Sequence, residues 1–190
     1  IFVDMRTALP RRDLLGGLAL IGTGIFLGTQ STAALPPDRR TKMNTRKIPR
    51  SGEELPVIGL GTWQTFDVGP SPAERASLLE VLRLFFAQGG RLIDSSPMYG
   101  RAEAVVGELL AELRPTPAPF LATKVWTSGR LKGEEQMRRS VARMDRLGSG
   151  QVDLMQVHNL LDLRTHLPVL RDWKAAGKIR YLGITHYALQ

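Results

Sequence analysis

The chain has 190 residues, long enough for one ordinary domain, and its 43% apolar and 23% charged side chains are typical of a globular protein. It contains no cysteine, which excludes disulfides, thiolate metal sites and cysteine nucleophiles from these residues. The net charge of +8 does not predict a nucleic-acid partner, because a nucleic-acid-binding domain carries its basic excess on its folded face. Here the excess lies in residues 1–50, which hold nine Lys and Arg against three Asp and Glu. Residues 51–190 hold 17 against 15.

Residues 1–34 are interpreted as an export signal. The pair Arg11-Arg12 precedes a stretch without charge from Leu14 to Pro37, whose apolar centre is shorter than the about 20 residues of a membrane helix. Small residues at Ser31–Ala34 are typical of the end of a secretory signal. The arginine pair resembles a twin-arginine signal, so we predict a periplasmic or exported protein carried by the twin-arginine export machinery. Membrane anchoring by an uncleaved leader is the alternative, and no stable membrane partner is expected.

Residues 35–45 are predicted to form a basic, proline-containing linker. Pro36-Pro37 favours extended backbone, and the charged side chains that follow favour a solvated segment. Residues 46–190 are predicted to form the folded body.

The body begins with an apolar, Gly-flanked strand over 57–61 and a helix that follows it. Ser71 is predicted as the N-cap, Pro72 as the first helical residue and Glu74 as the partner that closes a capping box. One apolar face is spaced at the helical period, and Gly89-Gly90 ends the helix by tolerating positive φ. That face consists of Leu78, Leu82, Phe85 and Phe86.

This strand–helix unit then repeats along the chain. Further strands are predicted over 91–94, 120–125, 152–157 and 179–185. Helices between them present apolar faces at Val106–Leu113, at Met137–Met144 and over 163–176, and the last is closed by Gly177. Five strands separated by four helices predict a parallel α/β sheet, which is either doubly wound or a barrel.

Two features favour a (β/α)8 TIM barrel. No Gly-x-Gly-x-x-Gly follows the first strand, so the usual dinucleotide turn of a doubly wound fold is missing. Asp94, Lys124 and His158 stand at the C-terminal ends of three successive strands, where a barrel has its active site. The chain is expected to be truncated after about strand 5 of this barrel, with strands six to eight beyond Gln190.

These residues fit the chemistry of carbonyl reduction. A hydride must come from a cofactor, because no side chain supplies one. Tyr99, five residues after Asp94, is a candidate proton donor, and an ammonium at Lys124 is expected to lower its pKa. Asp94 can hold Lys124 in place, and His158 can orient a carbonyl by a hydrogen bond.

Each residue also has an ordinary structural interpretation when it is considered alone. Asp94 can be a turn former, Tyr99 a packed loop aromatic and Lys124 a solvated surface charge. His158, followed by Asn159, can satisfy backbone groups at a strand end. The four together on neighbouring strand ends favour the catalytic interpretation.

The combination of motifs resembles the aldo-keto reductase family, in order and spacing, over about residues 46–190. The matching segments are Gly59–Trp63, Asp94–Gly100, Thr123–Trp126, Val152–His158 and Gly177–Gly183. The resemblance implies a barrel that binds NADPH, or less often NADH, across its C-terminal mouth without a Rossmann fold. It implies Tyr99 as proton donor, Lys124 and Asp94 as its partners, and His158 as the group that orients a small carbonyl substrate.

Further residues take their roles from the same resemblance. Gly61, Thr62 and Trp63 match the loop that borders nicotinamide and substrate, and Asp94 is also counted among the cofactor-binding residues. Thr185 and His186 stand where the family commonly has a Ser-Asn pair that holds the carboxamide. Trp63 and Trp126 suggest an aromatic-walled substrate pocket. The Arg46–Val57 segment resembles the hairpin that closes the bottom of the barrel.

Two other functions are considered beside an exported carbonyl reductase. The family includes potassium-channel accessory subunits, so a non-catalytic cofactor-binding accessory protein is one. An inactive truncated remnant is the other. Because an unclosed barrel leaves a strand edge unpaired, the 190-residue chain alone is expected to aggregate or stay partly unfolded, without measurable NADPH turnover.

Overall fold

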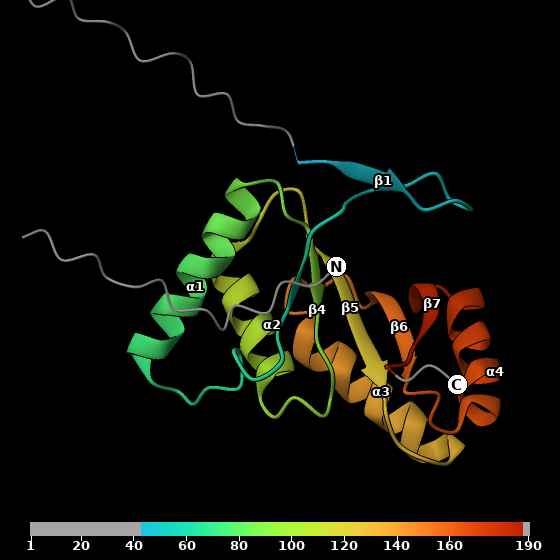
Figure 1. Ribbon diagram of the computed structural model, residues 1–190. Helices are drawn as coiled ribbons and strands as arrows, with labels where there is room; N and C mark the ends of the chain where they lie inside the picture. Colours follow the sequence, from blue (N-terminus) through green and yellow to red (C-terminus); the bar gives the residue numbers. More distant parts are fainter. Residues whose placement is uncertain (1–42, 188–190) are drawn as a thin grey trace, which may run out of the picture. The chain divides into compact units, whose positions relative to one another are not determined.

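The structure, a computed structural model, describes residues 43–187 (Figure 1). The predicted leader, residues 1–34, lies outside these residues, and so does all but the last three residues of the predicted linker. Within residues 43–187, no helix has the length and apolarity needed to cross a membrane.

A short antiparallel hairpin opens the described chain. Its strands are β1 (Thr45–Lys47) and β2 (Glu54–Pro56), and Gly52 turns between them with a φ of 74°. Glu53 accepts hydrogen bonds from Arg180 at 2.5 Å and from the Tyr181 hydroxyl at 2.6 Å. The hairpin therefore packs at the N-terminal end of the last strand, and the hairpin expected over Arg46–Val57 is present.

Five parallel strands form the main sheet: β3 (Gly59–Gly61), β4 (Leu92–Asp94), β5 (Phe120–Val125), β6 (Val152–His158) and β7 (Ile179–Thr185). Each strand pairs with the next one in the chain, so the spatial order is the sequence order. A doubly wound sheet would reverse direction at a switch point. The unreversed order is that of a barrel wall, as predicted.

Four helices connect these strands: α1 (Pro72–Ala87), α2 (Ala102–Leu113), α3 (Arg130–Met144) and α4 (Leu163–Ala175). Consecutive helices pack against each other, α1 on α2, α2 on α3 and α3 on α4, which Figure 1 shows as a series along the sheet. Helices α2 and α3 approach closely at Gly107, where a Cβ would lie 1.9 Å from the backbone oxygen of Arg143.

The helix-facing side of the sheet forms the core. Ile93, Leu121, Val125, Met155 and Val157 all lie buried in one apolar cluster with residues of the helices. Side chains alternate between the two faces of a strand. The residues between these core positions, among them the predicted site residues of β4, β5 and β6, therefore point to the opposite face.

The start of α1 differs from the sequence expectation. Ser71 is the N-cap and Pro72 the first helical residue, but the Ser71 side chain makes no capping hydrogen bond, so the predicted capping box with Glu74 is wrong. A residue before proline is driven toward extended backbone. Ser71, at φ −57° and ψ 120°, has this conformation. At the other end, Gly89 has a φ of 85°, as expected.

Candidate active site

A buried ion pair lies at the C-terminal ends of β4 and β5. The ammonium of Lys124 pairs with Oδ2 of Asp94 and donates a second hydrogen bond, 2.7 Å long, to the carbonyl oxygen of Ser95. Only 3% of Lys124 is exposed, so it is not a solvated surface charge. Burial lowers the pKa of Lys124, and the charge and hydrogen bond of Asp94 partly oppose that effect.

The second oxygen of Asp94 has its own partner, which the sequence analysis missed. The Gln156 side chain donates a hydrogen bond of 3.0 Å from Nε2 to Oδ1 of Asp94. Gln156 stands beside Lys124 in the β5–β6 register. On its other side lies Gly183, its partner in the β6–β7 register. The Asp94 carboxylate is thus held from two neighbouring strands.

Tyr99 lies in the loop after β4 with its ring beside the ion pair. The Lys124 ammonium is 5.1 Å from the ring centroid. Among residues 43–187, no side chain or backbone group hydrogen-bonds the Tyr99 hydroxyl, which leaves that hydroxyl available to a substrate oxygen. The predicted proximity of Tyr99 and Lys124 is therefore present in the structure.

The expected direction of the Tyr99 pKa is nevertheless wrong. Burial raises the pKa of Tyr99 above its ordinary value of 10.0, and the negative charge of Asp94 raises it further. The ammonium of Lys124 does not reverse this because it is itself paired with Asp94. The free site therefore keeps Tyr99 protonated at neutral pH.

The backbone around Tyr99 is held by residues of the loop after β3. Asp67 accepts a hydrogen bond of 2.9 Å from the backbone N–H of Arg101, at the start of α2. Gly100 packs against that carboxylate with a φ of 58°, which favours glycine. Thr62, fully buried, donates to the Asp94 carbonyl at 3.1 Å. Thr62 therefore braces the end of β4.

His158 ends β6, next to this group. Its Nδ1 lies 2.6 Å from the hydroxyl oxygen of Thr185 at the end of β7, and no described residue bonds its Nε2. Burial lowers the pKa of His158, and the positive charge of Lys124 acts in the same direction against a smaller opposing effect of Asp94. The imidazole is neutral at pH 7 and can bond a substrate through Nε2.

The remaining predicted residues lie at the same ends of the strands. Trp63 is 59% exposed, and its ring centroid is 6.5 Å from that of Tyr99. Trp126, 40% exposed, is fixed by Gln136, whose amide bonds both the backbone N–H and the carbonyl of Trp126. Gly61 pairs with Asp94 in the β3–β4 register. His186, which follows β7, is exposed.

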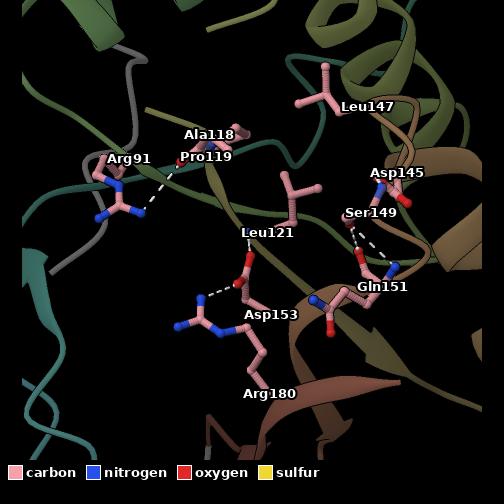
Figure 2. Close-up of a pocket in the computed structure, with 10 residues that line it drawn as sticks. All are labelled: Arg91, Ala118, Pro119, Leu121, Asp145, Leu147, Ser149, Gln151, Asp153 and Arg180. Carbon is pink, nitrogen blue, oxygen red and sulfur yellow. Dashed lines mark hydrogen bonds and ion pairs between the residues drawn. The ribbon is translucent and has the colours of Figure 1, made fainter. Parts of the chain in front are cut away.

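A pocket of about 340 Å³ lies at the opposite, N-terminal end of the strands (Figure 2). Arg180 bonds Asp153 there at 2.5 Å, and the other oxygen of Asp153 accepts from the backbone of Leu121. Asp145 accepts from three backbone N–H groups of its own loop. None of the predicted catalytic residues lines this pocket. The candidate active site is therefore the cluster of Asp94, Tyr99, Lys124 and His158 at the C-terminal ends of the strands.

Comparison with known proteins agrees with this geometry. The family model described as "Aldo/keto reductase family" matches residues 57–190. "Aldo-keto reductase YhdN" of Bacillus subtilis is 29% identical over 78% of the chain and 48% of that protein. "Methylglyoxal reductase YeaE" of Escherichia coli is 32% identical over 76% of the chain and 50% of that protein. The chain thus spans about half the length of these relatives.

Solved structures show the same fold. An aldo-keto reductase from Klebsiella pneumoniae in complex with NADPH has a TM-score of 0.62 and 26% identity, covering 76% of this chain and 51% of that one. The thermostable aldo-keto reductase Tm1743 has a TM-score of 0.64 and 25% identity, covering 76% and 54%. The strands follow the order of a barrel wall, an Asp–Lys–Tyr group lies at their C-terminal ends, and the family model matches residues 57–190. The chain therefore belongs to the aldo/keto reductase family.

Proposed function

We propose that the protein is an NAD(P)H-dependent oxidoreductase that reduces the carbonyl of a small aldehyde or ketone to an alcohol. One observation carries the proposal: Tyr99, with an unbonded hydroxyl, lies beside a buried ammonium that Asp94 holds in place. His158 ends β6, the strand beside that of Lys124, and its Nε2 is available to a substrate. An acid and a group that orients a carbonyl are thus brought to one place.

In this mechanism the side chains handle the proton. The Tyr99 hydroxyl donates its proton to the carbonyl oxygen as hydride reaches the carbonyl carbon, so the product is an alcohol. The Lys124 ammonium beside the ring offsets part of the cost that burial and Asp94 place on the phenolate that remains. Asp94 and the Ser95 carbonyl hold the ammonium, Gln156 holds Asp94, and water then reprotonates the phenolate. His158 orients the carbonyl by a hydrogen bond from Nε2.

The residues around this group fit a nicotinamide cofactor. When bound, the cofactor supplies the hydride that no side chain can supply. Gly61 leaves backbone accessible beside Asp94, and Trp63 presents an exposed ring next to Tyr99. Thr185 and His186 offer a hydroxyl and an imidazole for the carboxamide. NADPH is the proposed cofactor, with NADH as the alternative, and the Klebsiella pneumoniae neighbour is a complex with NADPH.

The substrate is proposed to be a carbonyl compound with an apolar body. Trp63, Met98 and Trp126 are all large apolar side chains with 40–59% of their surface exposed, and Trp63 lies against the proton donor. Exposed aromatic surface of this kind binds apolar groups by removing their surface from water.

The experiment that tests the proposal is Tyr99→Phe in the full protein, including any sequence beyond Gln190. Aldehyde reduction with NADPH is measured beside NADPH binding by calorimetry. We expect kcat/KM to fall by about 10²–10⁴, the usual contribution of a general acid, while binding is retained. Tyr187→Phe, at an 85% exposed position, is the control and should change nothing.

Other outcomes would redirect the assignment. A wild-type protein that binds NADPH but turns over no carbonyl is a cofactor-binding accessory protein. A wild-type protein that does neither is an inactive remnant. Full activity in Tyr99→Phe would remove the proposed proton donor and with it the mechanism.

We also propose that residues 1–34 direct export through the twin-arginine machinery. The arginine pair before a short apolar stretch supports this. Replacing Arg11 and Arg12 by lysine should leave the protein in the cytoplasmic fraction. The same replacement at Arg39 and Arg40, the other adjacent arginine pair in the N-terminal segment, is the control and should not affect export. Unchanged fractionation of the first variant would contradict the proposal.

A further inference from the structure

Thr185 and His158 are joined by a hydrogen bond that the proposed mechanism does not use. The two residues are paired in the register of β6 and β7, so the strands themselves bring the Thr185 hydroxyl oxygen to 2.6 Å from Nδ1 of His158. Both side chains are partly buried. The contact is therefore set by the sheet and not by a mobile loop.

A third group settles the direction of this hydrogen bond. After His158 the chain turns through two residues with positive φ, Asn159 at 53° and Leu160 at 58°. The turn directs the backbone N–H of Asn159 to the Thr185 hydroxyl oxygen, at a distance of 3.4 Å. Thr185 thus accepts a hydrogen from the backbone at the same oxygen that faces the imidazole.

Counting hydrogens then distinguishes the two neutral forms of His158. A hydroxyl has one hydrogen to donate and two lone pairs. If Nδ1 carried the imidazole proton, Thr185 would accept twice, and its own hydrogen would have no acceptor among residues 43–187. If Thr185 instead donates to Nδ1, the hydroxyl hydrogen, the imidazole Nδ1 and the Asn159 N–H all have partners, and only Nε2, which faces the proposed substrate, does not.

We infer that Thr185 is a positioning residue that fixes His158 as the neutral tautomer with its proton on Nε2. The inference rests on the proposed role of His158 and adds the reason why that residue recognises a carbonyl. An Nε2–H donates to a carbonyl oxygen. The other tautomer would present a lone pair to the same oxygen and repel it.

The groups that face His158 do not provide this preference. Lys124 on β5 and Asp94 at the end of β4 act on the charge of the ring, and their effects oppose each other. Neither bonds a nitrogen of His158. The Thr185 hydroxyl therefore determines which of the two neutral tautomers forms.

The test is ¹⁵N NMR of the full protein labelled at histidine, without cofactor or substrate. The chain has three histidines, and the His158 signals are assigned by their loss in His158→Asn. In wild type we expect a protonated Nε2 and an unprotonated Nδ1. In Thr185→Val, which keeps the shape and removes the hydroxyl, the two nitrogens should move toward averaged positions. Thr185→Ser should restore the wild-type pattern.

Kinetics give a second measurement. Thr185→Val should lower kcat/KM for carbonyl reduction about tenfold, the effect of losing one hydrogen bond, while Thr185→Ser stays within about twofold. A proton on Nδ1 in wild type would overturn the inference, and so would an unchanged His158 spectrum in Thr185→Val. The NMR result does not require turnover, so an inactive protein with the expected tautomer would contradict the proposed function alone. Circular dichroism confirms that each variant is folded.

Discussion

The side-chain amide of Gln156 bonds the Asp94 oxygen that Lys124 leaves unbonded, at 3.0 Å. The two residues lie 62 positions apart, on β4 and β6, with Lys124 on the strand between them. One carboxylate thus ties three consecutive strands together at the proposed site. Its orientation depends on the amide as well as on the ammonium.

Gln156→Leu should therefore weaken catalysis without unfolding the protein. The Asp94 carboxylate loses a donor, so it can rotate and hold Lys124 less firmly, and we expect kcat/KM to fall about tenfold. Gln156→Glu should be more harmful, because two carboxylates in contact share a proton and add an acid-dependent step to the pH profile. Gln151→Leu, at the other end of β6, is the control. Equal activity of wild type and Gln156→Leu would show that the amide has no role.

The pKa of Tyr99 can be measured directly by ultraviolet titration of tyrosinate. The difference between wild type and Tyr99→Phe isolates Tyr99 from Tyr181 and Tyr187. Burial and Asp94 both disfavour the phenolate, so the Tyr99 signal should appear above pH 10.0 in the protein without cofactor. Because the folded state retains this proton more strongly than the unfolded state, its contribution to stability is complete below pH 10 and declines above it. A transition below pH 10 would instead support the lowered Tyr99 pKa that the sequence predicted.

Gly100→Ala should disturb the loop that carries Tyr99. A Cβ at this position would lie 2.3 Å from both carboxylate oxygens of Asp67, and the φ of 58° is unfavourable for alanine. Asp67 cannot move away without losing its bond to Arg101. We expect a loss of about 2 kcal/mol in the free energy of unfolding, measured in urea, and reduced activity.

Gly52→Ala separates the cost of the positive φ from the cost of the contact with Asp67. Gly52 has a similar φ of 74°, but nothing lies within 4 Å of its Cβ position. It should therefore show only the backbone cost, about 1 kcal/mol, with normal activity. Equal losses in the two variants would mean that the Asp67 contact is unimportant.

Gly107→Ala should destabilise the protein although alanine is the better helix former by about 1 kcal/mol. The new Cβ would meet the backbone oxygen of Arg143 at 1.9 Å, so α2 and α3 must separate. Gly133→Ala is the matched variant, since its Cβ would meet the His166 ring at 2.4 Å and a side chain can shift more easily than backbone. Urea unfolding should rank Gly107→Ala as the less stable. The reverse order would contradict the assigned contact.

The elements themselves were largely predictable because local patterns determine them. The strands over 120–125 and 179–185 agree with the prediction, since apolar runs bounded by Pro119 and Gly177 leave little choice of limits. The first strand is shorter than expected, and Val57 and Ile58 are more than a third exposed. The hydrophobicity of those two residues did not reveal that they precede the sheet.

The arrangement of the site was predictable only in part. Asp94 and Lys124 pair as expected, because parallel strand ends meet at one edge. The hydrogen bond from Gln156 to Asp94 and the one between Thr185 and His158 depend on the register of β5, β6 and β7. That register cannot be read from a single sequence. The pKa of Tyr99 depends on how deeply its ring is buried, and this too is a tertiary property.

The contact of the hairpin with β7 has a consequence for folding. The Tyr181 hydroxyl donates to Glu53, and Arg180 bonds the same carboxylate, across 128 and 127 positions of the chain. Contact between such distant partners costs loop-closure entropy until the intervening strands and helices have shortened the path between them. A fluorescent label placed in the turn at Ser51 would therefore report a late event, the docking of the hairpin on the last strand of the sheet.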